Sequence, residues 1–172
     1  MSIVSRHKLF LPVNIYHQQM TTHSAERKLF NHYRKALFNE LGVKALDNYA
    51  IDRVGKHEFA AWGGCHAVDR VKLKPHHLYI INTDTHDKPG EHWVAMATTG
   101  TRAYIYDSYG RDVRKIVYQL IKTINKSRYK LSKTNLVTQE EQVGFSSEVC
   151  GQNSLAFLLV ARDLGITKAR NI

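Results

Sequence analysis

The chain has 172 residues, of which 43% are hydrophobic, and this is enough for one domain with a buried core. Its 25 Lys and Arg against 15 Asp and Glu give a formal charge of +10, which favours polyanionic partners such as nucleic acid. Two cysteines exclude a disulfide framework, and neither a secretory leader nor a membrane-spanning run is recognisable, so we expect a soluble, non-secreted protein of a reducing compartment.

Domain organisation follows from the absence of linkers, internal repeats and low-complexity segments. We therefore expect a single domain spanning residues 1–172. Residues 1–40 form an N-terminal extension that ends in a helix, and residues 41–165 form the core.

The first elements in chain order are a helix and a strand. Apolar residues at helical spacing predict an amphipathic helix over 24–41, with Ser24 as its N-cap and Gly42 just past its end. A short β-rich run after Pro75 predicts a central strand at 78–81.

Two further β-rich segments, 92–98 and 101–107, flank the dipeptide Thr99-Gly100, which predicts a tight hairpin. If these two residues form the turn, His92 pairs directly with Asp107. Directly paired residues project to the same face of a sheet, so the carboxylate could hold the imidazole in one tautomer. A surface cross-strand pair without catalytic meaning is the alternative reading.

The segment after the hairpin is strongly basic. Between residues 111 and 133 eight basic residues face one acidic residue, and apolar positions at helical spacing predict an amphipathic helix within it. The segment is either a solvated cationic surface or a sequence-independent nucleic-acid contact, because no base-reading module is present. The basic residues are Arg111, Arg114, Lys115, Lys122, Lys126, Arg128, Lys130 and Lys133.

The last third of the chain contains the candidate nucleophile, Cys150. It precedes a run that is apolar on nearly every side and ends at Gly165, so we expect a buried helix beginning at the cysteine. The N-terminus of a helix favours an anion, and a thiolate is one. Gly151 has no Cβ and would let a substrate carbonyl approach the backbone amides. The alternative is a cysteine that serves only as a small buried hydrophobe.

Several short motifs occur together in the order His92-Trp93, then 106–110 (YDSYG), then Gln142, then Cys150-Gly151. This combination resembles the adenovirus-type cysteine proteases, which are related in fold to the Ulp-like peptidases that remove SUMO. The resemblance covers about residues 41–164.

The resemblance implies an α+β fold of the papain-like or Ulp-like type. In it a mixed central β-sheet is flanked by helices, and the nucleophile lies at the N-terminus of a buried central helix. It also implies roles for single residues. Cys150 would be the nucleophile, His92 the general base and acid, and Asp107 the carboxylate that orients it. The side chain of Gln142 and the backbone of Cys150-Gly151 would stabilise the oxyanion, with Gln139 as the other candidate.

The resemblance also implies a biological role, a substrate class and a location. We expect a viral endopeptidase that matures virion precursor and structural proteins, cleaves beside Gly or other small residues, and acts as a monomer in the virion and in the host nucleus or cytoplasm. It implies no cofactor, although DNA or a peptide could act as an activator. Four departures from the family are an Asp at 107 instead of Glu, a gap of eight residues between Gln142 and Cys150, no cysteine within 108–149 to tether an activating peptide, and the N-terminal extension, residues 1–40, which has no counterpart in the family.

Other chemistries have weaker support in the sequence. A zinc site built on Cys65-His66, His76-His77 and His86 lacks the usual paired ligand spacing, so we expect no metal. No G-x-S-x-G motif or phosphate-binding loop occurs. An isopeptidase that acts on ubiquitin-like modifiers and a non-catalytic, basic nucleic-acid-binding protein with a protease-like fold remain the alternatives.

Overall fold

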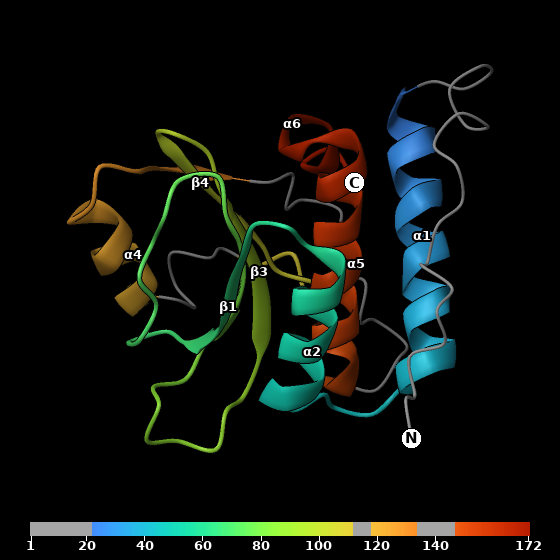
Figure 1. Cartoon of the computed structure of the whole chain (residues 1–172), viewed down its shortest axis with the longest axis horizontal. Helices are drawn as coiled ribbons and strands as arrows, with labels where there is room; N and C mark the ends of the chain where they lie inside the picture. The colour runs from blue at the N-terminus through green and yellow to red at the C-terminus, as the bar shows by residue number, and fades with distance from the viewer. Residues whose placement is uncertain (1–21, 112–117, 134–146) are drawn as a thin grey trace.

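The structure is a computed structural model of the whole chain, and it describes residues 22–111, 118–133 and 147–172. A β-sheet stands between a group of helices on one side and a single helix on the other (Figure 1). The N-terminal helix of the described part lies outermost in that group, packed against the helix Cys150–Leu164.

The sheet has five strands in the order in which they follow along the chain. The inner strands β2, β3 and β4 are antiparallel, whereas β1 is parallel to β2 and β5 is parallel to β4. The expected α+β architecture with a mixed sheet is therefore confirmed. The strands are β1 Trp62–Ala67, β2 Leu78–Asn82, β3 Trp93–Thr98, β4 Arg102–Tyr106 and β5 Lys130–Lys133.

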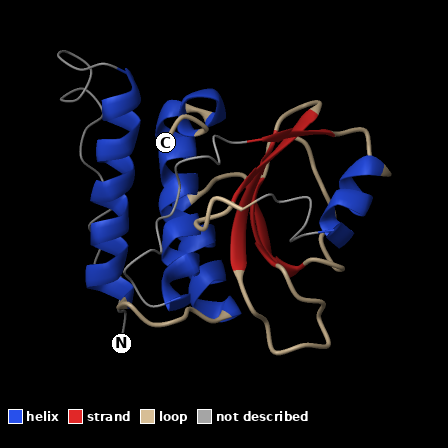
Figure 2. Cartoon of the chain, turned by 180° about the vertical axis from the view of Figure 1, so that it is seen from behind, coloured by secondary structure: helices blue, strands red, loops and turns tan. Residues whose placement is uncertain are grey.

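Helices cover both faces of this sheet. The view from behind shows one helix, α4, on the opposite side of the sheet from the other helices (Figure 2). The helices are α1 Thr22–Leu41, α2 Asn48–Glu58, α4 Tyr118–Asn125, α5 Cys150–Leu164 and α6 Ile166–Ala169, and the 3₁₀ turn η3 Ser147–Val149 leads into α5.

Two hydrophobic cores result, one on each face of the sheet, because side chains alternate along each strand. On β3, Trp93 and Ala95 belong to the core shared with α1, α2 and α5, whereas Val94 and Met96 belong to the core on the α4 side. The first twelve residues of α5 are all buried. The expectation of a buried helix that begins at Cys150 is confirmed, and it ends at Gly165 with φ 83°.

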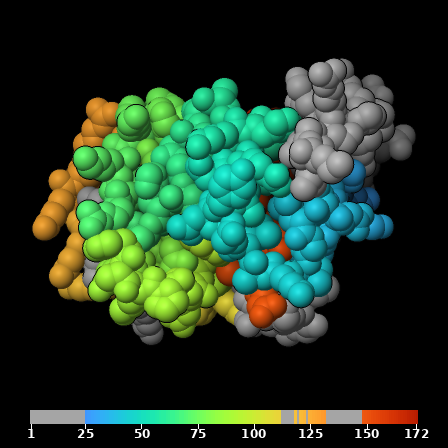
Figure 3. Space-filling view, turned by 60° about the horizontal axis from the view of Figure 1, so that its bottom comes forward, coloured from blue at the N-terminus to red at the C-terminus, as the bar shows by residue number. Residues whose placement is uncertain are grey.

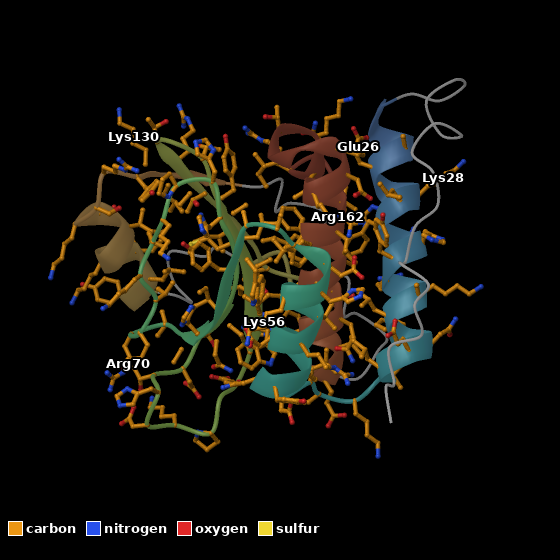
Figure 4. The ribbon with its side chains drawn as sticks, in the orientation of Figure 1. Glu26, Lys28, Lys56, Arg70, Lys130 and Arg162 are labelled. Atoms are coloured by element: carbon orange, nitrogen blue, oxygen red, sulfur yellow. The ribbon has the colours of Figure 1, made fainter. Side chains whose placement is uncertain are left out.

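Polar contacts between helices fix α1 and α2 to the end of α5. Arg162 donates to Glu58 at 2.6 Å and to the hydroxyl of Tyr33 at 3.2 Å, and Tyr33 in turn donates to Asp163. Figure 4 shows Arg162 on α5, on the side of the helix that faces α1. The helical layer is thereby held together at the end of α5 farthest from Cys150.

The hairpin register differs from the predicted one. Ala95 pairs with Tyr106 and Thr98 pairs with Ala103, so His92 and Asp107 are not direct cross-strand partners. Thr99 and Arg102 close the turn, because the Thr99 N–H donates to the Arg102 carbonyl at 2.8 Å and the Arg102 N–H donates to the Thr99 hydroxyl at 3.0 Å, which leaves Gly100 and Thr101 between them. The predicted Thr99-Gly100 turn was therefore wrong by one residue, and this shifts the pairing register by two.

The predicted helices and strands need smaller corrections. The first helix begins at Thr22, so Ser24 lies inside it and is not its N-cap, and the predicted strand at 78–81 extends to Asn82. Of the predicted basic helix, the part within α4 is confirmed, with Leu120 and Ile124 fully buried. Within the described ranges, no helix is both long and apolar enough to cross a membrane.

Candidate active site

Cys150 is the first residue of α5, and its side chain is 4% exposed. The residue before it, Val149, provides no side-chain cap, so the backbone N–H groups of the first turn of α5 receive no capping oxygen from that position. The backbone N–H of Trp93 points at the sulfur, with a distance of 3.5 Å from nitrogen to Sγ. The thiol therefore lies where several N–H dipoles favour negative charge.

His92 lies between Asp107 and Cys150. Its Nε2 is 2.6 Å from Oδ1 of Asp107. The thiol of Cys150 acts on the same imidazole, because hydrogen bonding and charge interaction with it help to raise the pKa of His92. Because Nε2 is occupied by the carboxylate, Nδ1 is the ring nitrogen left for the sulfur. The structure thus brings together all three residues that the sequence assigns to nucleophile, base and orienting carboxylate.

The contact between His92 and Asp107 survives the altered register for a simple geometric reason. Side chains alternate between faces with a period of two, so a shift of two residues leaves both side chains on the same face. The pair changes from directly opposite to diagonal, a separation that long side chains can bridge. His92 comes directly before β3 and Asp107 directly after β4, so both lie at the same end of the strand pair.

Burial and charge act in opposite directions on this pair. Burial alone would lower the pKa of His92, but hydrogen bonds and charge interactions with Asp107 and Cys150 outweigh it, so the pKa is raised above 6.5. Burial alone would raise the pKa of Asp107, yet His92 and Arg111 hold it below its ordinary value. The arrangement therefore favours the ionised form of Asp107 and the protonated form of His92.

Arg111 belongs to this site, which the sequence did not indicate. Its Nε donates to Oδ2 of Asp107 at 3.0 Å, so both carboxylate oxygens are engaged. The ring of Tyr109 contacts both side chains, with its centroid 5.1 Å from that of His92 and 4.7 Å from the guanidinium of Arg111. Arg111 was predicted as part of a nucleic-acid surface, and the contact that it makes here is with the carboxylate.

Asn82 shapes the loop that leads to His92 and was also missed. Its side-chain oxygen accepts the backbone N–H of Asp84 at 2.9 Å and of Glu91 at 3.3 Å. Gly90 has φ 93°, and a Cβ there would collide with the amide of Asn82, so glycine is required at this position. The loop therefore delivers His92 to the start of β3 in a fixed position.

A cleft of about 670 Å³ opens beside the thiol. One wall comes from the connection between α1 and α2, including Leu46, and another from the loop before β3, including Gly90, while Cys150 and Trp93 also line it. In the space-filling view only small patches of the C-terminal segment (red) are visible, beside residues of the first third of the chain (blue to cyan) (Figure 3). An extended ligand laid in this cleft would pass beside Sγ.

Gln152 connects α5 to the cleft wall that lies between α1 and α2. Its side-chain nitrogen donates to the carbonyls of Gly42 at 3.0 Å and Lys44 at 2.8 Å, and Trp93 Nε1 donates to the carbonyl of Leu46 at 3.1 Å. A Cβ on Gly151 would lie 3.3 Å from the Cβ of Leu46, so the glycine allows α5 and the wall to approach closely. The predicted oxyanion role of Gly151 stays a prediction.

The remaining predicted residues divide into two groups. Gln142, Gln139, Arg114 and Lys115 lie outside the described residues, and of Lys133 only the backbone, in β5, is described. Lys122, Lys126, Arg128 and Lys130 are exposed on or near α4 and β5. Lys130 and Lys28 lie at opposite sides of the molecule (Figure 4), so the positive charge is not confined to one face.

Cys65, the second cysteine, does not line the cleft beside Cys150. It lies on β1, and burial, together with the charges of Asp52 and Asp47, raises the pKa of its thiol to about 12. Among residues 22–111, 118–133 and 147–172, the His, Cys, Asp and Glu side chains form no group of three or more that could hold a metal ion.

Comparison of the chain with family models, with curated proteins and with solved structures finds no significant match.

Proposed function

We propose that this chain is a cysteine endopeptidase of the adenovirus-protease type. The observation that carries the proposal is the hydrogen bond between Asp107 and His92 beside the thiol of Cys150, which lies 3.5 Å from the backbone nitrogen of Trp93 and lines a cleft. A His in contact with a carboxylate alone would be an ordinary ion pair. A thiol at a helix N-terminus on the other side of the same imidazole is the arrangement that thiol catalysis requires.

The proposed reaction runs through a thioester. Sγ of Cys150 attacks the peptide carbonyl carbon while His92 holds the thiol proton, and the carbonyl oxygen becomes an oxyanion. His92 then gives the proton to the leaving amine as the C–N bond breaks. Water attacks the thioester, with His92 as the base, and the thiol leaves with the proton returned to it. Asp107 keeps the imidazole in the required tautomer throughout.

The oxyanion would be stabilised at the start of α5, where the backbone N–H of Cys150 has no side-chain cap in front of it. The Gln142 amide is the second proposed donor. Loss of one such donor lowers kcat by about 10² to 10³. The papain-like or Ulp-like form of the fold is part of this proposal. It is supported by a nucleophile helix packed against an antiparallel strand pair that carries the base and its carboxylate.

The proposed substrates are precursor and structural proteins of a virion, with small residues such as Gly at the cleaved bond. DNA is the proposed second partner, bound without sequence preference through Lys122, Lys126, Arg128 and Lys130. Because α4 lies across the sheet from α5, DNA bound there would leave the cleft open (Figure 2). With four phosphate contacts, affinity should fall about 10²-fold between 50 and 200 mM salt. Salt-independent anisotropy titrations would remove DNA from the proposal.

The test of the proposed function is cleavage of a proteome-derived peptide library by the wild-type chain, with Cys150→Ala as the inactive variant and Cys65→Ala as the matched control. We expect cleavage by the wild type and Cys65→Ala and none by Cys150→Ala. Cleavage by all three would identify a contaminant and contradict the proposal. Conjugates of ubiquitin-like modifiers, tested in parallel, distinguish an isopeptidase, which would use the same chemistry on a different bond.

A further inference from the structure

The cleft beside Cys150 has a local charge opposite to that of the molecule. Three acidic residues line it, Asp47 from the connection before α2, Glu91 from the loop before β3 and Glu148 from η3, and no Lys or Arg of the described ranges does. All three are exposed. The chain as a whole carries +10, so an acidic cleft is not what the composition predicts.

Within the part of the chain that the structure describes, these carboxylates form no ion pair with Lys or Arg. Asp47 accepts the backbone N–H of Ala50 on Oδ1 and so caps α2, but no Lys or Arg pairs with it, with Glu91 or with Glu148. Lys44 and Lys88 are close in sequence to lining residues but do not line the cleft themselves. A cationic group that entered the cleft would therefore meet no internal competitor among these residues.

An aromatic side chain independently indicates what the cleft accepts. Tyr49 lines it and is 76% exposed, one of three large apolar side chains that the described part leaves in solvent. An exposed ring beside carboxylates is a favourable setting for an ammonium or guanidinium group, because the ring face attracts a cation and the carboxylates neutralise it. The aliphatic stem of Lys or Arg would cover part of the ring.

We propose that the cleft selects polypeptide substrates that carry a Lys or Arg close to the scissile bond, with Asp47, Glu91, Glu148 and Tyr49 as the residues that select it. The inference rests on the proposed function and adds to it a substrate class. It also conflicts with the expectation from net charge, because a chain of +10 should attract acidic peptides. Peptides that differ only in charge therefore decide between a preference for basic substrates and a preference for acidic ones.

The test measures binding and cleavage separately. Three pools of fluorescein-labelled eight-residue peptides, built from Gly, Ala, Ser and Leu with two Lys, two Gln or two Glu, are titrated against Cys150→Ala by anisotropy. We expect the Lys pool to bind about tenfold tighter than the Glu pool at low salt, with a smaller difference at high salt, because exposed charge pairs are weak and screened. Equal binding of the pools, or tighter binding of the Glu pool, would overturn the inference.

Charge-neutral variants then locate the effect. Glu91→Gln and Glu148→Gln, each in the Cys150→Ala background, should reduce the Lys preference about twofold to threefold. Glu40→Gln removes the same charge from the exposed surface of α1 and should leave the preference unchanged. An equal loss in Glu40→Gln would show that net charge, not the cleft, causes the preference, and would contradict the inference.

Cleavage by the wild type separates this inference from the proposed function. If Lys peptides bind preferentially and no peptide is cleaved, the endopeptidase proposal fails and the cleft preference stands. If peptides are cleaved without any preference for Lys over Gln and Glu, the endopeptidase proposal stands and the basic preference fails.

Discussion

Replacing Asp107 with Asn tests the role of the carboxylate most sharply, because it removes one charge and keeps the shape of the side chain. Asp107 is fully buried and His92 is 5% exposed, so water cannot replace the lost charge. The variant retains an oxygen that can accept a hydrogen bond from Nε2, so the change acts mainly on the imidazolium form of His92.

The size of the effect follows from the distance within the pair. At an effective dielectric constant of about 20, unit charges 2.6 Å apart attract each other by about 6 kcal/mol before the cost of desolvation, which removes part of this. Each factor of ten in rate corresponds to about 1.4 kcal/mol. We therefore expect Asp107→Asn to lower kcat by between about 10² and 10⁴ in cleavage of the best library peptide, because an imidazolium forms during the reaction.

Two assays other than activity follow the same change. In an NMR titration of His92, its pKa should fall in Asp107→Asn, because burial then acts against a weaker set of favourable contacts. The raised folded-state pKa of His92 contributes stability that is fully present below about pH 6.5 and is lost as pH rises through that pKa. The lowered pKa of Asp107 contributes stability present above about pH 3.8 and lost as pH falls through it. In urea unfolding, the variant should therefore lose more stability at pH 5.5 than at pH 9.

The reasoning would be refuted by an Asp107→Asn variant whose kcat is within about threefold of wild type and whose His92 titrates as before. A matched control is Asp87→Asn, which removes an exposed carboxylate in the loop between β2 and β3. It should leave the titration of His92 unchanged, and also the difference in stability between pH 5.5 and pH 9, because the pKa of Asp87 is held below 3.8 by its hydrogen bond with Thr85.

Three further predictions concern other residues of the fold. Arg111→Gln removes the cation on Oδ2 of Asp107, so the pKa of Asp107 should rise toward its ordinary value in a carboxyl ¹³C titration, and an unchanged pKa would contradict the assigned contact. Gln152→Met leaves two carbonyls of the cleft wall without their donor, so KM should rise severalfold with a smaller change in kcat, and a loss confined to kcat would contradict a role in holding the wall. Gly55→Ala places a Cβ against the Trp62 indole and should lower the free energy of unfolding by about 1 to 3 kcal/mol in urea titrations, whereas a stabilised variant would contradict the packing of α2 on β1.

The sequence predicted where β3, β4 and α5 begin and end better than it predicted the pairing register of β3 with β4. A period of two told which residues of the hairpin share a face, and that is enough to bring His92 and Asp107 together under either register. It could not tell a turn at residues 99–100 from one at residues 100–101, because the hydroxyl of Thr99, which leaves no periodic pattern, closes the observed turn.

Several elements escaped prediction for identifiable reasons. β1 contains Gly63 and Gly64, which weaken a strand pattern, and it is glycine at 63 that makes room for the Tyr79 ring of the next strand. β5 is short and polar, so nothing in its sequence separates it from a loop. Asp47, which caps α2, is a residue type that favours a helix start, but few positions of α2 are apolar, so no helical periodicity is visible.

The positioning residues of the site could not be read from the sequence at all. Arg111 lies in a basic segment, where its charge looks like one of many, and its contact with Asp107 depends on the tight turn at Gly110, which has φ 65°. Gln152 and Asn82 act on backbone groups far away in sequence or in an irregular loop. Contacts of this kind are properties of the tertiary fold and leave no periodic pattern.

The central claim is that Cys150 is an activated nucleophile, and competitive alkylation tests it most directly. The native protein is treated with limiting iodoacetamide at neutral pH, and the labelling rates of Cys150 and Cys65 are compared by mass spectrometry in the wild type and in His92→Ala. Because burial and nearby carboxylates raise the pKa of Cys65 to about 12, we predict labelling of Cys150 at least about tenfold faster than of Cys65 in the wild type, and a strong loss of that advantage in His92→Ala. Equal, slow labelling of the two thiols, with no effect of His92→Ala, would contradict the account.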